Sequence, residues 1–324
     1  MELTTVVTPI FWVGFIVFVL AMLALDLFVL GGGKAHRVSA REAGSWTFAW
    51  VGMALTFNGL LWWWLDGTAG REVANAKGLE FLTGYLIELS LSVDNVFVFI
   101  MIFSFFAVPP EYQRRVLLYG VIGAIVMRAI MIFAGSILVT QFHWILYVFG
   151  AFLVFTGIKM LIFAERAADL SQNPVLRWMR GHMRITEEYH GERFTVVKDG
   201  VRWFTPLFLV LALIEVSDLI FAVDSIPAIF AITTDPFIVF TSNIFAILGL
   251  RAMFFLLADL RARFHLLKYG LALVLVFVGT KMLIAGFYKV PIGLALGIVA
   301  LILASSVIAS LVSTRKSIAA KGPA

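Results

Sequence analysis

A chain of 324 residues would ordinarily suggest two soluble domains, but the composition excludes them. Hydrophobic residues make up 61% of the chain and charged residues only 14%, with a mean hydropathy of +0.99. These values exclude a soluble enzyme, a nucleic-acid-binding protein and a disordered chain, and they indicate a polytopic membrane protein. The absence of cysteine removes disulfides, thiolate metal sites and cysteine nucleophiles.

Nine apolar runs are long enough to be membrane-spanning helices, so we expect an all-α integral membrane protein. The first run follows Glu2 without a basic segment, which favours a retained helix over a cleaved signal. The predicted spans are 9–30, 44–65, 79–107, 117–138, 143–164, 204–231, 237–258, 264–287 and 291–313.

The distribution of basic residues predicts the orientation. Lysines and arginines gather in the segments after the first, third, fifth, seventh and ninth runs, whereas the opposite side carries only Arg71, Lys77 and Lys289. The positive-inside rule therefore places the N-terminus outside and the C-terminus in the cytoplasm, which nine spans satisfy. This pattern also accounts for the net charge of +5 without an acidic partner or nucleic acid.

An internal repeat organises the middle of the chain. The segment Gly157-Ile158-Lys159-Met160-Leu161-Ile162 recurs 122 residues later as Gly279-Thr280-Lys281-Met282-Leu283-Ile284. Arg128-Ala129 recurs as Arg251-Ala252, and Val93-Asp94 recurs as Val223-Asp224. Each unit has three spans, so the second copy must be inverted in the membrane, as in secondary transporters that bind substrate near the midplane.

The repeat divides the chain into five parts. Residues 1–78 hold two peripheral helices, 79–164 the first three-helix unit, and 204–287 the second, inverted unit. Residues 165–203 form a cytoplasmic connector, too small for a catalytic domain, with one short helix. Residues 288–324 hold the last helix and a cytoplasmic tail.

Six carboxylates fall inside the predicted spans, where each costs roughly 2.5–3.5 kcal/mol and needs a partner or a wet cavity. Asp26 lies near a helix end and is expected to be interfacial. The other five lie in the helices that open the two units. They are Glu88, Asp94, Glu215, Asp218 and Asp224.

The spacing of these acids leaves two arrangements open. Glu215 and Asp218 share a helix face, but Glu88 to Asp94, like Asp218 to Asp224, spans six residues and is about 120° out of alignment in a regular helix. Either the helices are locally unwound or the acids face different neighbours. Pro227 supports a break in the second of these helices.

The donors around the acids are all oxygen ligands, which favours a hard divalent cation such as Mn²⁺, Mg²⁺ or Ca²⁺. We expect the five acids to form a metal site, with Asn95, Ser225 and Asn243 as supporting ligands. Arg128 and Arg251 lie within spans at matching places and are candidate charge partners. Protons that compete for the carboxylates would couple metal movement to pH. No prosthetic group is expected.

Two other classes of function stay open at this point. The acids could be structural ion pairs with Arg128 and Arg251, in a membrane-embedded assembly or stress-response factor. An intramembrane aspartyl protease would need a Gly-x-Gly-Asp segment, which none of the six spanning acids has. We therefore expect no enzyme.

At the two acidic helices the chain resembles the TerC family, named for tellurium resistance, and especially its Alx-like members. The resembling segments are Tyr85-Leu86-Ile87-Glu88, Ser92-Val93-Asp94-Asn95, Glu215-Val216-Ser217-Asp218, Phe221-Ala222-Val223-Asp224-Ser225-Ile226-Pro227-Ala228, Thr241-Ser242-Asn243 and Gly249-Leu250-Arg251-Ala252. The resemblance implies a manganese exporter of the bacterial cytoplasmic (inner) membrane, with the five acids handling the metal. Only the resemblance favours Mn²⁺ over the other two cations.

Overall fold

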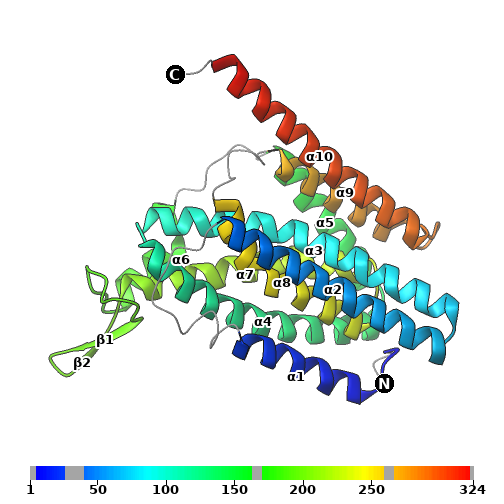
Figure 1. Ribbon diagram of the computed structural model, residues 1–324, viewed down its shortest axis with the longest axis horizontal. Coiled ribbons are helices and arrows are strands. Elements are labelled where there is room, and N and C mark those ends of the chain that lie inside the picture. Colours follow the sequence, from blue (N-terminus) through cyan, green and yellow to red (C-terminus); the bar gives the residue numbers. More distant parts are fainter. Residues whose placement is uncertain (1–4, 26–39, 163–169, 259–265, 322–324) are drawn as a thin grey trace.

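The computed structural model describes residues 5–25, 40–162, 170–258 and 266–321 as a bundle of long helices with a small hairpin at one end (Figure 1). Within these ranges, eight helices are long and apolar enough to cross a membrane, and a ninth, α1, is apolar but has 17 residues. The helical runs expected from the sequence are all present. Asp26 and the end of the first run lie outside the described residues.

Most helix ends lie within four residues of the predicted ends, but α3 and α4 begin eight and seven residues early and α10 ends eight residues late. The bounds are α1 Pro9–Leu25, α2 Ala40–Thr68, α3 Arg71–Phe105, α4 Pro110–Gln141, α5 Ile145–Ile162, α7 Pro206–Phe230, α8 Pro236–Ala258, α9 Leu267–Ile284 and α10 Ile292–Lys321. The early start of α3 is stabilised by Lys77, whose ammonium group is 2.8 Å from a Glu80 carboxylate oxygen one turn later.

Of the two arrangements left open, local unwinding of the acidic helices is wrong. Helix α7 runs without interruption through Pro227, and α3 is continuous over 35 residues. Pro227 lies only three residues before the end of α7, so it disturbs a single turn, and neighbouring helices bury it. A regular helix therefore places acids six residues apart on different faces.

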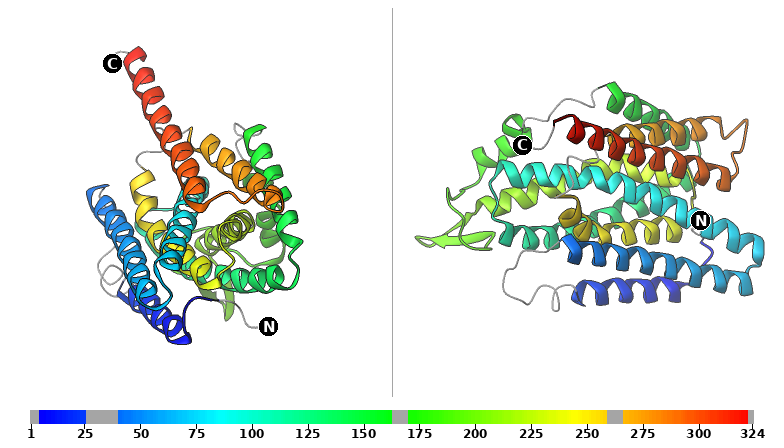
Figure 2. Two further views of the ribbon diagram at one scale, coloured as in Figure 1. Left: turned by 90° about the vertical axis from the view of Figure 1, so that its right-hand side faces the viewer. Right: turned by 45° about the horizontal axis from the view of Figure 1, so that its top comes forward.

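The helices of the two predicted units form the centre of the bundle. Helix α8 is the most enclosed, with 94% of its apolar span buried, whereas α5 and α10 face outward over most of their surface. Helix α3 packs on α7 and α8, and α7 packs on α4. Helices α5 and α9 pair along one side, α1 and α2 lie on another, and α10 crosses outside α9 (Figure 2).

The contact between α5 and α9 is reciprocal. A Cβ atom on Gly157 would lie 2.8 Å from the carbonyl oxygen of Ala272, and one on Gly279 would lie 2.7 Å from that of Gly150. Gly157 and Gly279 are equivalent in the repeat, as are Gly150 and Ala272. An inverted repeat requires such exchanged pairs, and the repeat itself stays a prediction.

The connector between the units is more ordered than a solvated loop. It contains the turn η2 Leu170–Gln172, the expected short helix as α6 Pro174–His182, and an unpredicted hairpin of β1 Thr195–Lys198 and β2 Val201–Phe204. The strands pair antiparallel from Thr195 opposite Phe204 to Lys198 opposite Val201. Asp199 and Gly200 join them with positive φ angles, and this Asp-Gly pair is a hairpin signal visible in the sequence.

Candidate functional site

An arginine between two carboxylates occupies the middle of the bundle. Glu88 is the central residue of α3, Asp218 is the central residue of α7, and Arg128 projects from α4 between them. All three side chains are 0–3% exposed. Each acid is therefore at the midpoint of a helix that is long and apolar enough to cross a membrane.

The guanidinium group of Arg128 contacts both acids. Its Nη2 and Nε donate to the two carboxylate oxygens of Asp218 at 3.0 and 3.3 Å, while Nη1 donates to Oε1 of Glu88. The contact with Asp218 is the bidentate geometry that gives an arginine–carboxylate pair its strength. Glu88 and Asp218 are equivalent positions of the predicted repeat, so matching acids of the two units share one cation.

Three neutral side chains complete what we call the Arg128 cluster: Glu88, Asn95, Arg128, Asp218, Ser225 and Asn243. Asn95 donates to Oδ1 of Asp218 at 3.1 Å, and Nη1 of Arg128 reaches Oδ1 of Asn243 at 2.7 Å and Oγ of Ser225 at 3.5 Å. The members come from α3, α4, α7 and α8, and all are nearly fully buried.

Within the described ranges, the cluster leaves two acceptors and one donor unpaired, the donor being Nδ2 of Asn243. Oε2 of Glu88 and Oδ1 of Asn95 are buried and have no hydrogen-bond partner among the described residues. Two carboxylates against one guanidinium leave a formal charge of −1. An unpaired buried polar atom costs about 1–3 kcal/mol, so the hydrogen bonding and the charge of the cluster are both incompletely balanced.

The remaining acids of the same helices face elsewhere. Asp94 interacts electrostatically with Lys268 at the start of α9, and Asp224 accepts a hydrogen bond from Thr156 of α5, with Lys159 nearby. Each half-buried acid thus faces one member of the α5–α9 pair. The second of the two predicted arrangements, acids with different neighbours, is confirmed.

Glu215 lies beside the cluster, next to α4. The Glu215 carboxylate packs so closely against Gly123 of α4 that a Cβ atom there would overlap it. The negative charges of Glu215 and Asp218 also repel each other. Arg251 is half-buried in α8, in contrast to its fully buried counterpart Arg128.

The five acids therefore do not form one site in this structure. Glu88 and Asp218 come together with all three expected supporting residues and Arg128, while Asp94 and Asp224 face other helices and Glu215 packs against α4. In the described part of the chain, no group of three histidine, aspartate or glutamate side chains is placed to hold a metal ion. The role of the five acids as metal ligands stays a prediction.

A second polar group, missed in the sequence, lies at the bundle end opposite the hairpin. We call it the Lys77 network: Lys77, Glu80, Thr233 and Asp235. Lys77 is 2.8 Å from Glu80 and 3.8 Å from Asp235, and Thr233 donates to Glu80 at 2.5 Å. The side chain of Asp235 also accepts from Thr5 and from the backbone of Val6, both at 3.1 Å. Because the third span was predicted to begin at residue 79, Lys77 was placed in a loop.

Comparison with known proteins identifies the family. The model of the family described as "Integral membrane protein TerC family" matches residues 73–318. A protein of Salmonella typhi, named as a proposed membrane-bound redox modulator, Alx, is 59% identical over 297 residues, which are 92% of each chain. Its counterpart in Escherichia coli K12 is 58% identical over the same share.

More distant relatives extend along the same length. An uncharacterised membrane protein of Myxococcus xanthus is 50% identical over 308 residues, covering 95% of this chain and 94% of the relative. No solved structure matches the chain. The acidic helices, the apolar bundle and these matches agree, and the chain belongs to the TerC family of integral membrane proteins.

Proposed function

We propose that this protein is a secondary transporter that exports a divalent metal ion, with Mn²⁺ as the physiological cargo, from the bacterial cytoplasm across the inner membrane. The observation that carries the proposal is the Arg128 cluster. Two fully buried carboxylates lie at the midpoints of α3 and α7, with amide and hydroxyl oxygens beside them. Intramembrane acids of this kind mark ion pathways.

The donor set suits a hard divalent cation. Glu88 and Asp218 would supply carboxylate oxygens, and Asn95 and Asn243 would supply amide oxygens. The guanidinium group now holds the carboxylates, so a metal ion competes with Arg128 for the same atoms. The two carboxylates and the guanidinium group together carry a formal charge of −1. With a divalent ion in place of the guanidinium group, the same two carboxylates are neutralised. Arg128 would thus keep the acids paired when no metal is bound.

The surrounding acids provide places for the ion or for counter-moving protons. Asp94 and Asp224 are half-buried, one turn and a half beyond the central pair on α3 and α7. Each lies beside a cation, Lys268 or Lys159. We propose that they bind the metal transiently on either side of the centre and exchange it for protons. Proton competition would make export depend on pH.

The name of the enterobacterial relatives is compatible with this proposal. Those proteins are named as proposed redox modulators. This chain has no cysteine, so its own thiols cannot carry a redox function. A redox effect would follow from movement of a redox-active metal such as manganese.

The proposal is tested by Mn²⁺ flux into proteoliposomes with purified full-length protein. We expect Glu88→Gln and Asp218→Asn to lower the flux at least tenfold, and Asp94→Asn and Asp224→Asn to lower it and shift its pH dependence. Asp66→Asn is the matched control, because Asp66 pairs with the exposed Arg71 at a helix end. Unchanged Mn²⁺ flux in the four variants would sink the proposal.

A second candidate, a membrane-embedded assembly or stress-response factor of the tellurium-resistance type, is favoured by one specific observation. The bidentate pair between Arg128 and Asp218 is what a structural acid would form. In that case the neutralising substitutions lower the amount of protein in the membrane and leave the manganese content of cells unchanged. Measurement of both quantities in the same cells separates the two functions.

A further inference from the structure

Three oxygen atoms on one face of α3 are buried and have no hydrogen-bond partner among the residues that the structure describes. They are Oε2 of Glu88, Oγ of Ser92 and Oδ1 of Asn95, and the three side chains are only 0–1% exposed. Residues four and seven positions apart return to the same side of an α-helix, so these side chains share one face. Glu88 and Asn95 belong to the Arg128 cluster, and Ser92 lies between them on α3.

The hydroxyl group of Ser92 differs from those of neighbouring serines on the acidic helices. Ser90 donates to the carbonyl oxygen of Leu86 at 2.6 Å. Ser217 donates in the same way to Leu213 at 2.7 Å. This bond to the preceding turn is a common way for a serine inside a helix to satisfy its hydroxyl group. Within the described ranges Ser92 makes no such bond, so its oxygen stays available to a ligand.

The contacts of Arg128 hold Glu88 and Asn95 on the two sides of Ser92. Nη1 of Arg128 donates to Oε1 of Glu88, and Nη2 donates to Oδ1 of Asp218 at 3.0 Å. The same Oδ1 accepts from Nδ2 of Asn95 at 3.1 Å. Along the axis of α3, Ser92 lies about 6 Å after Glu88 and about 4.5 Å before Asn95. The hydrogen bonds thus use one polar atom of each flanking side chain and leave its other oxygen free.

The second unit has no counterpart of this hydroxyl group. In the repeat, Ala222 takes the position of Ser92, and it is fully buried. Both carboxylate oxygens of Asp218 accept hydrogen bonds from Arg128. Of the cluster residues that the structure describes, those with unpaired oxygens are all on α3. A cation that enters the centre therefore meets free oxygens on α3 while Arg128 stays bound to Asp218.

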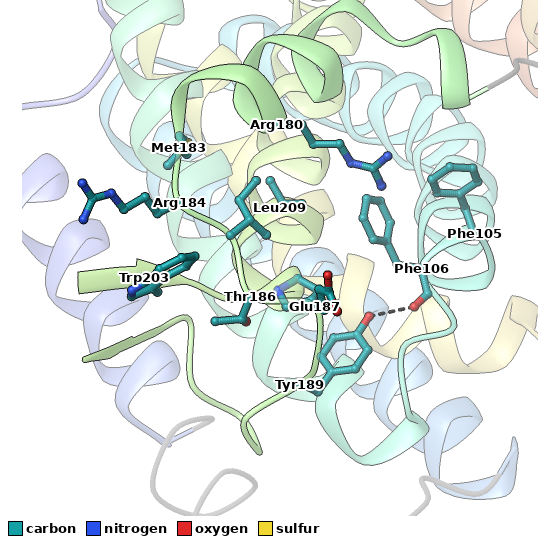
Figure 3. Close-up of a pocket in the computed structure, with 12 residues that line it drawn as sticks. Phe105, Phe106, Arg180, Met183, Arg184, Thr186, Glu187, Tyr189, Trp203 and Leu209 are labelled. Carbon is teal, nitrogen blue, oxygen red and sulfur yellow. Dashed lines mark hydrogen bonds between the residues drawn. The ribbon is translucent and has the colours of Figure 1, made fainter. Parts of the chain in front are cut away.

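The pocket of about 730 Å³ at the inner end of α3 offers no comparable set of donors. Arg180 and Arg184 extend to opposite sides of it, with the carboxylate of Glu187 between them (Figure 3). Two positive charges beside one carboxylate disfavour a bound cation. The oxygen donors suited to a metal ion are at the centre of the bundle.

We propose that Ser92 is a further ligand of the metal ion, so that α3 supplies a carboxylate, a hydroxyl and an amide oxygen to it. This inference rests on the proposed metal export and adds a residue that determines the choice of metal. All three donors are hard oxygen ligands, which suit Mn²⁺. The ion binds first to the free atoms of α3, before the guanidinium group leaves Glu88.

The test is metal binding by purified full-length protein in detergent, measured by isothermal titration calorimetry. Ser92→Ala should bind Mn²⁺ at least about tenfold more weakly, the lower end of what the surroundings of a metal ion contribute to its affinity. Its melting temperature should be unchanged or higher, because the substitution removes an unpaired buried hydroxyl group. A serine that only supports the fold would give the opposite result on both measurements.

Ser92→Cys supplies a second readout that a structural role would not change. A thiolate is a soft ligand, so this variant should bind Cd²⁺ more tightly and Mn²⁺ more weakly than the unaltered protein does. Because the chain has no cysteine, the ultraviolet absorption of a cadmium–thiolate bond would report this one position.

Ser136 is the matched control, because its hydroxyl group is also buried and unpaired within the described residues. It lies eight residues after Arg128 on α4, which is about 12 Å along the helix. Ser136→Ala should bind Mn²⁺ like the unaltered protein, and Ser136→Cys should give no cadmium–thiolate absorption.

The outcomes separate this inference from the proposed function. If the unaltered protein binds Mn²⁺ and Ser92→Ala binds it equally well, Ser92 is not a ligand, and metal export still stands. A lower melting temperature of Ser92→Ala, without a cadmium signal in Ser92→Cys, would overturn the inference in favour of a structural serine. Absence of Mn²⁺ binding by the unaltered protein would overturn both proposals.

Discussion

Arg128 is the residue on which the centre of the molecule depends. It is 1% exposed and meets two carboxylates and two neutral oxygens from three other helices. A buried ion pair stabilises a protein little more than apolar residues of the same volume would. Removal of one partner, however, leaves the other charge buried without compensation and is strongly destabilising. Here a single cation compensates two acids, so its loss has an unusually large effect.

We predict that Arg128→Met lowers the free energy of unfolding by about 3–5 kcal/mol, because Glu88 and Asp218 are left buried without their cation. The apparent melting temperature in detergent measures this. Glu88→Gln and Asp218→Asn, added to Arg128→Met, should restore much of the loss. Arg71→Met removes a 66% exposed arginine and should change the stability by less than about 1 kcal/mol. An Arg128→Met protein as stable as the Arg71→Met protein would contradict the role of the buried pair.

The residues of the central cluster could be predicted, but the distribution of the five acids could not. Glu88, Asp218 and Arg128 were placed together because charges inside spans need partners and occupy matching positions in the repeat. The helix face on which Asp94 and Asp224 lie depends on whether the two helices are regular, which the sequence does not decide. Pro227 suggested a break, and it was the tertiary packing around Pro227 that allowed α7 to continue.

At the scale of elements, the α5–α9 pair is held by close backbone approach. Gly150 and Gly157 of α5 meet Gly279 and Ala272 of α9 at distances that leave no room for a Cβ atom. In a membrane, small residues let two helix backbones approach closely. The resulting van der Waals contacts and interhelical hydrogen bonds drive helix association. The hydropathy of the sequence predicts both helices. The glycine that recurs as Gly157 and Gly279 is the one sequence feature that indicates their close packing.

We predict that Gly279→Ala destabilises the protein by about 1–3 kcal/mol, because the new Cβ would lie 2.7 Å from the carbonyl oxygen of Gly150 and push the helices apart. Gly297→Ala in α10 is the control, since nothing lies within 4 Å of its Cβ position. It should be neutral or slightly stabilising. Thermal unfolding in detergent compares the two, and equal melting temperatures would show that α5 and α9 separate without cost.

At the scale of the whole molecule, the Lys77 network joins the two units at the end that the sequence places outside. Lys77 and Glu80 belong to α3, and Thr233 and Asp235 belong to the turn between α7 and α8. If export proceeds by alternating access, these contacts must break for an ion to leave at that end.

We predict that a link across this network stops export. Because the chain has no cysteine, Glu80→Cys/Thr233→Cys introduces the only two thiols, and a short bifunctional maleimide can join them. Mn²⁺ flux in proteoliposomes should fall at least tenfold on treatment, whereas each single-cysteine protein should be unaffected. Full flux through the linked protein would mean that the ion leaves by another route.

The central ion pair also bears on how the protein is made. Glu88 and Arg128 are both in the first unit, so their contact can form as soon as α3 and α4 have entered the membrane. Asp218 is synthesised ninety residues after Arg128 and meets a guanidinium group that is already in place. We therefore expect the first half of the chain to present the cation against which the acidic helix of the second half packs.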